Sequence, residues 1–295
     1  MNDSATLIGT DLNGYTVLKY ISNGSFGTVY ECKNNVTNES VAIKIPIVND
    51  EKNGEKSLIE EGKIYKYLNK NKTDGDGILN VKILSNKTLN KKIMVMDLLG
   101  LSLEKIIHRD KKLRLKNVIL ITIQILYILQ FIHSQGYIHR DIKPDNFVLD
   151  KKGEKIYCVD FGLATKYKNK PFKKHLNFCG TVRYASISAH KGYSQSCKDD
   201  LEAVCYMLVY LFKGHLPWMY INEKNKKKKY KKIQSIKEKI PENELCSQLP
   251  KEYEIFLKYV KNMDYDEEPP YKLFIKMFLK LLHSKKYHNL NLKLI

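Results

Sequence analysis

Short runs of apolar residues, many of them β-branched or aromatic, alternate with polar segments in the first hundred residues, as in half-buried β-strands. These runs occupy residues 15–21, 28–32, 41–45 and 93–96. Residues 58–68 instead have helical periodicity, because Ile64 and Leu68 fall on one face of a helix. The polar, glycine-bearing residues 69–77 predict a loop after this helix. The first third of the chain is therefore predicted to be strands with one helix.

Two helices and a pair of short strands are predicted further along the chain. The helices are residues 101–107 and 115–133, and the strands are residues 147–150 and 155–159. The most apolar segment, residues 118–129, is about half the length needed to cross a bilayer and contains Gln124. We therefore expect it to be part of a buried helix, and we expect no membrane span.

Length and composition limit the class of protein. A chain of 295 residues with 43% hydrophobic content can bury a core and form one large or two modest domains. Its six cysteines include no C-x-x-C pair, which indicates neither a zinc site nor a disulfide framework and favours a reducing compartment. Residues 1–6 have neither a basic region nor an apolar run. We therefore expect an intracellular protein, cytoplasmic, nuclear or both, that is not secreted.

Residues 139–146, H-R-D-I-K-P-D-N, gather three chemical functions in a segment that Pro144 keeps from being helical. Asp141 offers a carboxylate that can accept a proton, and Lys143 offers an ammonium that can hold a phosphate oxygen. Asn146 offers an amide oxygen that can bind a metal ion. Phosphoryl transfer needs these three functions, and the segment closely resembles the catalytic loop of eukaryotic protein kinases. The structural alternative is a solvated polar turn before a strand.

A second segment resembles the G-x-G-x-x-G-x-V motif of kinases, with Ser22 in place of the first glycine. Glycines let backbone N–H groups approach phosphates closely. A dinucleotide-binding turn would open a helix here, but residues 28–32 are typical of a strand, which favours a hairpin over phosphates. An ordinary hairpin turn is the alternative. The nucleotide-binding residues that this resemblance implies are Ile21, Ser22, Asn23, Gly24, Ser25, Phe26, Gly27, Thr28 and Val29.

Lys44 is the single lysine of an apolar strand, and a charge in such a strand needs a partner. Glu60 and Glu61 of the following helix are both candidates, and a lysine that snorkels from a surface strand is the alternative. The strand resembles the V-A-I-K strand of kinases, which implies that Lys44 holds the α- and β-phosphates near Ala42.

Kinase order along the chain implies the rest of the nucleotide site. Met96 would border the rear of the adenine pocket, and the backbone of Asp97 and Leu99 would hydrogen-bond the adenine. D-F-G at residues 160–162 follows a predicted strand, and Asp160 would bind Mg²⁺ together with Asn146.

Residues 180–188, G-T-V-R-Y-A-S-I-S, stand where most protein kinases have A-P-E. They resemble the G-T-x-R-Y-A-S-I-N of the casein kinase 1 family, as do residues 96–104, 199–202 and 216–218. The likeness runs from residue 15 to residue 282. Resemblance to the E-S-K-I-Y motif of that family implies that Glu61 is the partner of Lys44. The likeness departs at Ser22, Ser188, Ala203 and Cys205.

The resemblance implies an α+β, bilobal protein-kinase fold, with a small, mainly antiparallel-sheet N-lobe that contains one key helix and a larger, mainly helical C-lobe. The N-lobe would be residues 1–97 and the C-lobe residues 98–295, forming one kinase domain over residues 15–282. ATP and Mg²⁺ are the implied cofactors, and the γ-phosphoryl group would pass to serine or threonine hydroxyls of protein substrates, with the enzyme a monomer. The implied catalytic residues are Asp141, Lys143, Asn146, Lys44 and Glu61.

The formal net charge of +19 attracts nucleic acid, anionic membranes or acidic proteins, and charge alone does not choose among them. Family members prefer acidic or already phosphorylated sites, and Arg183 and Lys229 are the implied anion site, the latter by resemblance to K-R-Q-K-Y. The alternative is that the lysine-rich residues 224–232 form a solvated, partly disordered loop and bind no anion. A catalytically silent kinase-fold scaffold and a basic nucleic-acid-associated protein stay open, although sparse aromatic residues in the run disfavour direct nucleic-acid binding.

Overall fold

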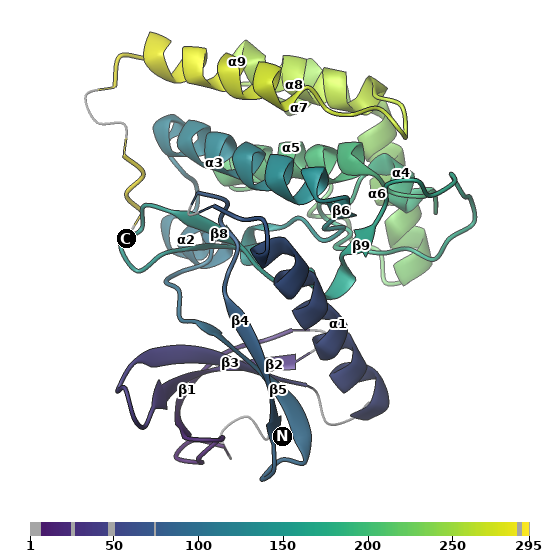
Figure 1. The fold of residues 1–295 in the computed structure, drawn as a ribbon. Coiled ribbons are helices and arrows are strands. Elements are labelled where there is room, and N and C mark those ends of the chain that lie inside the picture. Colours follow the sequence, from purple (N-terminus) through teal and green to yellow (C-terminus); the bar gives the residue numbers. More distant parts are fainter. Residues whose placement is uncertain (1–6, 25–26, 47–50, 74, 288–290, 295) are drawn as a thin grey trace. The chain divides into compact units, whose positions relative to one another are not determined.

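The computed structural model of the protein describes residues 7–24, 27–46, 51–73, 75–287 and 291–294. The chain divides into two compact units, which are coloured along the sequence in Figure 1. The first unit is Met1–Gly100 with Val159–Gly162, and the second is Leu101–Cys158 with Leu163–Ile295. Four residues from the middle of the chain thus belong with the N-terminal hundred.

An antiparallel sheet of five strands forms most of the first unit, in the order β1-β2-β3-β5-β4. The strands are β1 (Tyr15–Asn23), β2 (Gly27–Asn34), β3 (Ser40–Pro46), β4 (Val81–Asn86) and β5 (Lys91–Asp97). Their alternating apolar side chains, among them Val17, Ile43 and Ile93, make a core that is almost wholly shielded from solvent. Helix α1 (Glu51–Asn69) packs across β3, β4 and β5.

Gly62 lies in the middle of α1, where a glycine weakens a helix by up to about 1 kcal/mol relative to alanine. The structure gives a physical reason for its presence. A Cβ atom at this position would meet Cγ1 and Cδ1 of Ile83 on β4 at 2.7 and 2.8 Å. The missing side chain therefore lets α1 approach the sheet closely, next to the residue Glu61 that precedes it.

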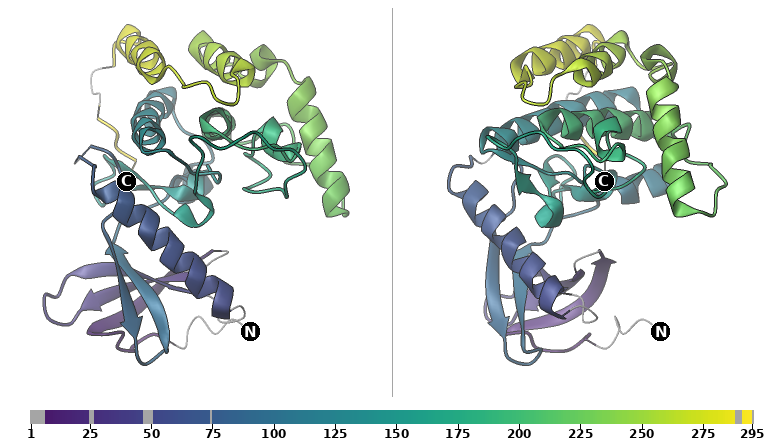
Figure 2. Two further views of the ribbon diagram at one scale, coloured as in Figure 1. Left: turned by 45° about the vertical axis from the view of Figure 1, so that its right-hand side comes forward. Right: turned by 90° about the vertical axis from the view of Figure 1, so that its right-hand side faces the viewer.

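The second unit is mainly helical and is built around two buried helices, α3 (Leu115–Ser134) and α5 (Cys197–Lys213). The other helices are α2 (Leu103–Asp110), α4 (Ile187–His190), α6 (Lys226–Lys239), α7 (Glu242–Leu245), α8 (Lys251–Asn262) and α9 (Tyr271–Ser284). Helix α9 packs on α3 and α8 packs on α5, whereas α6 runs along one edge of the unit (Figure 2).

Two short antiparallel strand pairs position the irregular segments of the second unit. Strand β6 (Tyr137–Ile138) pairs with β9 (Thr165–Lys166), and β7 (Phe147–Leu149) pairs with β8 (Ile156–Cys158). Between β6 and β7 the chain makes only one turn of 3₁₀ helix, Pro144–Asn146. Residues 139–143 therefore have no regular secondary structure.

Helix α3 is longer than the apolar residues 118–129 that it contains. It has 20 residues and, by length and composition alone, could cross a membrane. However, 12 of its residues are buried within the second unit, which is typical of the core helix of a globular domain.

The structure confirms the predicted α+β class, and the predicted strands and helices lie where the apolar patterns placed them. Strand β4 was missed, because its residues V-K-I-L-S-N mix polar and apolar side chains without a strong turn signal. The alternative interpretation of residues 224–232 as a disordered loop is wrong, since most of them form the first two turns of α6.

We expect Gly62→Val to destabilise the protein by about 1–3 kcal/mol, the usual cost of overpacking, because the new side chain would collide with Ile83. Urea unfolding measures this change. Lys66→Val, at an exposed position of the same helix, is the control and should cost only a few tenths of a kcal/mol. Adding Ile83→Ala to Gly62→Val should recover part of the loss, and an unchanged double variant would show that the clash is not the cause.

Candidate active site

The segment between β6 and β7 is held by the carboxylate of Asp200, on the first turn of α5. Its Oδ2 accepts the backbone N–H of His139 at 2.7 Å, and its Oδ1 accepts that of Arg140 at 2.9 Å. The ring Nε2 of His133, on α3, lies 2.9 Å from the same Oδ2. Asp200 is only 2% exposed, so these bonds are made away from water and fix the start of the segment firmly.

Arg140 has a positive φ of 65°, which is unusual for a residue with a side chain. Its Nε donates to the carbonyl of Leu163 at 2.7 Å, and its own carbonyl lies against Gly180. A Cβ atom at Gly180 would lie 2.5 Å from that carbonyl oxygen, and Gly180 itself has a φ of 106°. Only glycine fits there, and the chain beginning at Gly180 is thereby held next to residues 139–146.

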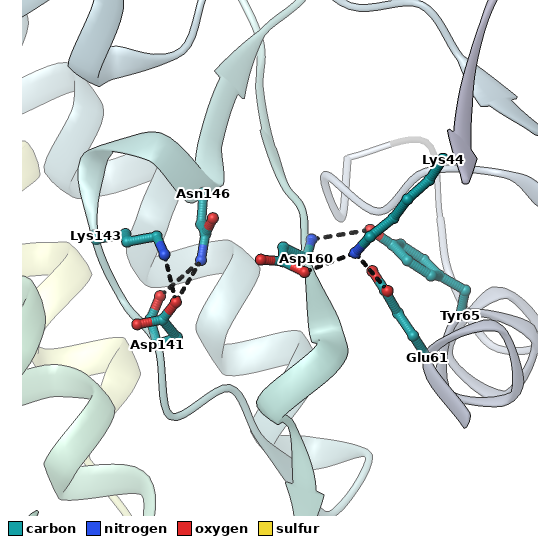
Figure 3. Close-up of polar contacts among 7 residues, drawn as sticks. All are labelled: Lys44, Glu61, Tyr65, Asp141, Lys143, Asn146 and Asp160. Atoms are coloured by element: carbon teal, nitrogen blue, oxygen red, sulfur yellow. Dashed lines mark hydrogen bonds and ion pairs between the residues drawn. The ribbon is translucent and has the colours of Figure 1, made fainter. Parts of the chain in front are cut away.

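The side chain of Asp141 lies close to those of Lys143, Asn146 and Thr181 (Figure 3 shows all but Thr181). Asp141 Oδ2 lies 2.6 Å from Lys143 Nζ, and Oδ1 accepts the Thr181 hydroxyl at 2.6 Å. Asn146 Nδ2 donates to the Asp141 carbonyl at 2.9 Å, which leaves its Oδ1 turned away from Asp141. The carboxylate is therefore positioned on one side by an ammonium and on the other by a hydroxyl.

In the first unit, Lys44 of β3 lies between two carboxylates (Figure 3). Its Nζ is 2.7 Å from Glu61 Oε2 and 2.9 Å from Asp160 Oδ1. Glu60 instead pairs at the surface with Lys63, at 2.6 Å. The structure thus places Glu61, not Glu60, against Lys44.

The charges in this cluster compensate one another. Burial lowers the pKa of Lys44, but the carboxylates of Glu61 and Asp160 outweigh burial and raise it above its ordinary value. Burial raises the pKa of Glu61, and the Lys44 ammonium opposes that rise. Lys44 therefore stays charged, and its ammonium is held in one position by two short contacts.

Asp160 is fixed by its backbone as well as by Lys44. Its φ is 65°, and its N–H donates to the hydroxyl of Tyr65 on α1 at 3.3 Å. The Tyr65 ring makes an edge-to-face contact with Phe161, with ring centroids 4.9 Å apart. The Asp160 side chain is 28% exposed. A strained residue held in place by its neighbours is a frequent feature of functional sites.

The described residues predicted to bind the nucleotide all belong to the first unit. Residues 21–23 end β1 and Gly24 follows it, residues 27–29 begin β2, and Ala42 and Lys44 are on β3. Val29 pairs with Lys44, and Ala42 pairs with Met96 on β5. Strand β5 ends at Asp97, and Leu99 follows it. Ser25 and Phe26 lie outside the described residues.

Gly27 has a packing role that the sequence did not indicate. A Cβ atom there would lie 2.6 Å from the carbonyl oxygen of Ile45 and 3.3 Å from Cγ of Lys44. The absence of a side chain therefore lets β2 lie directly beside the Lys44 side chain.

The residues predicted to bind Mg²⁺ have suitable chemistry. Asp160 supplies a partly exposed carboxylate, and Asn146 supplies an amide oxygen whose nitrogen is already bonded. Carboxylate and amide oxygens are the hard ligands that Mg²⁺ prefers. The donor set therefore fits this ion.

The two residues predicted to bind anions lie on different elements of the second unit. Arg183 stacks over the rings of Tyr184 and Tyr210, with its guanidinium carbon 5.8 and 5.6 Å from their centroids. Its Nη1 is 3.9 Å from Glu104 Oε1, so part of its charge is already balanced. Lys229 is on α6, and its side chain is partly exposed.

Comparison with known proteins identifies the family. The protein kinase domain family matches residues 15–287. The "Probable casein kinase I homolog" of Encephalitozoon cuniculi (strain GB-M1) is 36% identical over 269 residues, which cover 89% of this chain and 86% of the relative. The chain belongs to the casein kinase 1 family of protein kinases. It is therefore a serine/threonine protein kinase with the bilobal kinase fold that the sequence predicted.

Protein kinases in general use ATP and Mg²⁺ and act on protein substrates. The first unit of this casein kinase 1 family member is the sheet-containing lobe, and the second is the mainly helical lobe.

Three residues of the kinase site were not singled out from the sequence. In the sequence, Asp200 and Thr181 stand out only as parts of family motifs, and no local signal connects Tyr65 with Asp160. Asp200 carried a usable signal, because two adjacent acids at the start of a long apolar helix favour its N-terminus. The contacts of Thr181 and Tyr65 arise from folding alone.

Asp200→Asn should lower the free energy of unfolding by about 3–5 kcal/mol, because it removes the charged partner of a buried histidine. Burial lowers the pKa of His133, but Cys197 and Asp200 outweigh burial and raise it to about 10. The contribution of this group is thus fully present below its ordinary pKa of 6.5 and is lost as the pH rises through about 10.

Urea unfolding at several pH values between 6 and 10 checks both points. The wild type should lose more stability over this range than Asp200→Asn does. Asp266→Asn, the same change at an exposed position, is the control and should behave as the wild type. Equal stability and equal pH dependence of Asp200→Asn and wild type would contradict the assigned anchor.

Proposed function

We propose that Asp141 is the catalytic base, which orients the acceptor hydroxyl of a protein substrate and takes its proton. The observation that carries this proposal is the contact between Asp141 and the Thr181 hydroxyl at 2.6 Å. This hydroxyl has the chemistry of a substrate serine or threonine, and it already donates to the carboxylate. Lys143 contacts the other oxygen of Asp141 and would steady the γ-phosphate as charge moves onto it.

The nucleotide would be held by residues of the sheet-containing lobe. Lys44 binds the α- and β-phosphates while Glu61 keeps its ammonium in place, and the main chain near Gly24 and Gly27 covers the phosphates. Ala42, Met96 and the backbone of Asp97 and Leu99 would contact the adenine. Asp160 and Asn146 would hold Mg²⁺, which neutralises charge on the phosphate oxygens when bound. The lobes predicted as residues 1–97 and 98–295 would follow the two units, except that residues 98–100 and 159–162 belong to the first unit. The kinase would act as a monomer.

The preferred substrates would have acidic or phosphorylated residues near the target hydroxyl. Arg183 presents a guanidinium stacked on two aromatic rings, and such a planar cation suits phosphate. Lys229 lies on a helix whose lysines at 226–229, 231 and 232 surround it with positive charge. The net charge of +19 would attract acidic substrates over a longer range.

The protein would act inside the cell, in the cytoplasm, the nucleus or both. Its six cysteines are all free, which suits a reducing compartment. The scaffold alternative is disfavoured because every catalytic residue type is present in the chain. Binding of nucleic acid to α6 is disfavoured, because Tyr230 is the one aromatic residue among its lysines and stacking on bases needs several.

Asp141→Asn is expected to lower kcat by about 10²–10⁴-fold, since it removes the group that accepts the proton. Phosphate incorporation into casein measures the rate, and binding of a fluorescent ATP analogue should be unchanged. The exposed Asp266→Asn is the matched control and should keep wild-type turnover. Undiminished phosphate transfer by Asp141→Asn would refute the assigned base, and no transfer by the wild type with any divalent metal would favour the scaffold.

Arg183→Ala with Lys229→Ala should raise KM for a phosphate-primed peptide about tenfold or more, because each charge-assisted bond contributes about 1.5–3 kcal/mol. KM for the same peptide without the phosphate should change little. The double variant Lys258→Ala with Lys272→Ala removes two exposed charges elsewhere and serves as the control. An equal loss on both peptides would indicate a general electrostatic effect and sink the anion site.

A further inference from the structure

Lys237, on α6, is a buried lysine that the proposed chemistry leaves without a function. It has no solvent exposure, although lysines are rarely buried completely. Its ammonium faces the segment after Gly180, donating to the carbonyl of Val182 at 3.1 Å and to that of Ala185 at 2.6 Å. The third neighbour is Nε2 of His190, at 3.3 Å. An ammonium has three N–H donors, so this site offers one acceptor for each.

Two aromatic rings complete the site around Lys237. The ammonium lies 4.8 Å from the ring centroid of Tyr206 on α5 and 5.0 Å from that of Trp218. Aromatic faces attract cations, which favours the charged form of the lysine. Trp218 also contacts the same segment, because its Nε1 donates to the carbonyl of Arg183 at 2.8 Å. The carbonyls of Val182, Arg183 and Ala185 are therefore all bonded by these two side chains.

The rest of the segment is tied to α5. Ile187 N–H donates to Glu202 Oε1 at 2.9 Å, and the same oxygen accepts the Tyr206 hydroxyl at 2.7 Å. The Ser186 hydroxyl donates to Asp199 at 2.6 Å. The side chains of Ser186, Asp199, Glu202 and Tyr206 are buried, so these bonds hold the segment against α5. The Arg183 side chain is partly exposed and lies over the Tyr184 ring.

We propose that Lys237 is a positioning residue for the protein substrate. Its ammonium fixes the main chain on both sides of Arg183 and so presents the guanidinium to the acidic group of the substrate. This inference rests on the anion site described above under the proposed function. Lys237 would not touch the substrate or the nucleotide, and its effect would pass through residues 182–185.

The charge of Lys237 is sensitive to pH. Burial lowers its pKa to about 7, against the opposing influence of Glu202. Burial and then Lys237 lower the pKa of His190 to about 3, so this ring is neutral and can accept a bond. A neutral lysine has only two N–H donors, and one of its three acceptors would then lose its partner. The segment should thus be held less firmly as the pH rises through about 7.

Other titratable groups face Lys237 or the residues that it contacts. Tyr206 has a pKa raised well above its ordinary value by burial, so it stays neutral over this range. Burial raises the pKa of Asp199, which bonds Ser186, to about 6. Glu202 faces the ammonium from α5, and Glu238 on α6 faces His190.

The test compares Lys237→Met with Lys239→Met, which removes the same charge from an exposed position of α6. We expect Lys237→Met to raise KM for the phosphate-primed peptide about tenfold, while KM for ATP and kcat at saturating peptide stay within about twofold of wild type. Lys239→Met should match wild type in all three. An unchanged KM for the primed peptide, in a variant that melts cooperatively, would overturn the proposal.

A spectroscopic measurement is independent of activity, because Trp218 is the single tryptophan of the chain. Its emission should change with a midpoint near pH 7 in wild type and in Lys239→Met. Lys237→Met should lack this transition. A transition near pH 7 that persists in Lys237→Met would show that the lysine does not titrate beside the ring, and would overturn its charge-dependent role.

Two further outcomes are decided by the same assays. If Lys237→Met does not fold, the pH dependence of KM in the wild type is measured in place of the variant. KM for the primed peptide must then rise above pH 7 more steeply than KM for the unprimed peptide. Parallel pH profiles would overturn the proposal. If wild type does not distinguish primed from unprimed peptides, the anion site fails, and KM of Lys237→Met for the unprimed peptide decides whether Lys237 positions the substrate segment.

Discussion

The buried carboxylate of Asp200 is the constraint on which the catalytic segment depends. Residues 139–143 have no regular secondary structure, so their backbone N–H groups lack the partners that a helix or strand would give them. Asp200 accepts the N–H groups of His139 and Arg140 and pairs with His133, thereby joining α3, α5 and the segment. The segment can hold Asp141 in one position because Asp200, on a packed helix, accepts hydrogen bonds from the backbone of the two residues before it.

The same principle applies to two buried lysines of this protein. Lys44 is shielded among the strands and is compensated by Glu61 from α1 and by Asp160 from a distant part of the chain. Lys237 is shielded beneath the segment after Gly180 and is compensated by backbone carbonyls and two rings. A buried charge is costly unless several partners surround it, so each of these side chains specifies the relative position of the segments that supply its partners.

Much of the fold and of the candidate site could be predicted from the sequence, because the relevant signals are local. Apolar periodicity located four of the five sheet strands as well as α1, α2 and α3, and the kinase motifs drew attention to Lys44, Asp141 and Asp160. What could not be predicted depends on contacts between distant segments. The bond from Thr181 to Asp141 joins residues 40 positions apart, and that from Asp160 to Tyr65 joins residues 95 apart. The polarity of residues 224–232 suggested a loop, but an N-cap at Asn225 and the anchoring of Ile233 and Lys237 in the core make most of them helical.

Glycines show how a local departure from propensity can reveal a contact. Gly62 is a poor helix former, Gly27 is a poor strand former, and Gly180 has a φ that other residues avoid. A Cβ atom at each would lie 2.5–2.7 Å from an atom of another segment, namely Ile83, Ile45 or Arg140. These three contacts lie beside Glu61, Lys44 and the segment that holds Asp141. These three glycines, which local propensity disfavours, are thus positions where two segments of the chain approach closely. The close approach sets the spacing of the side chains that carry the chemistry.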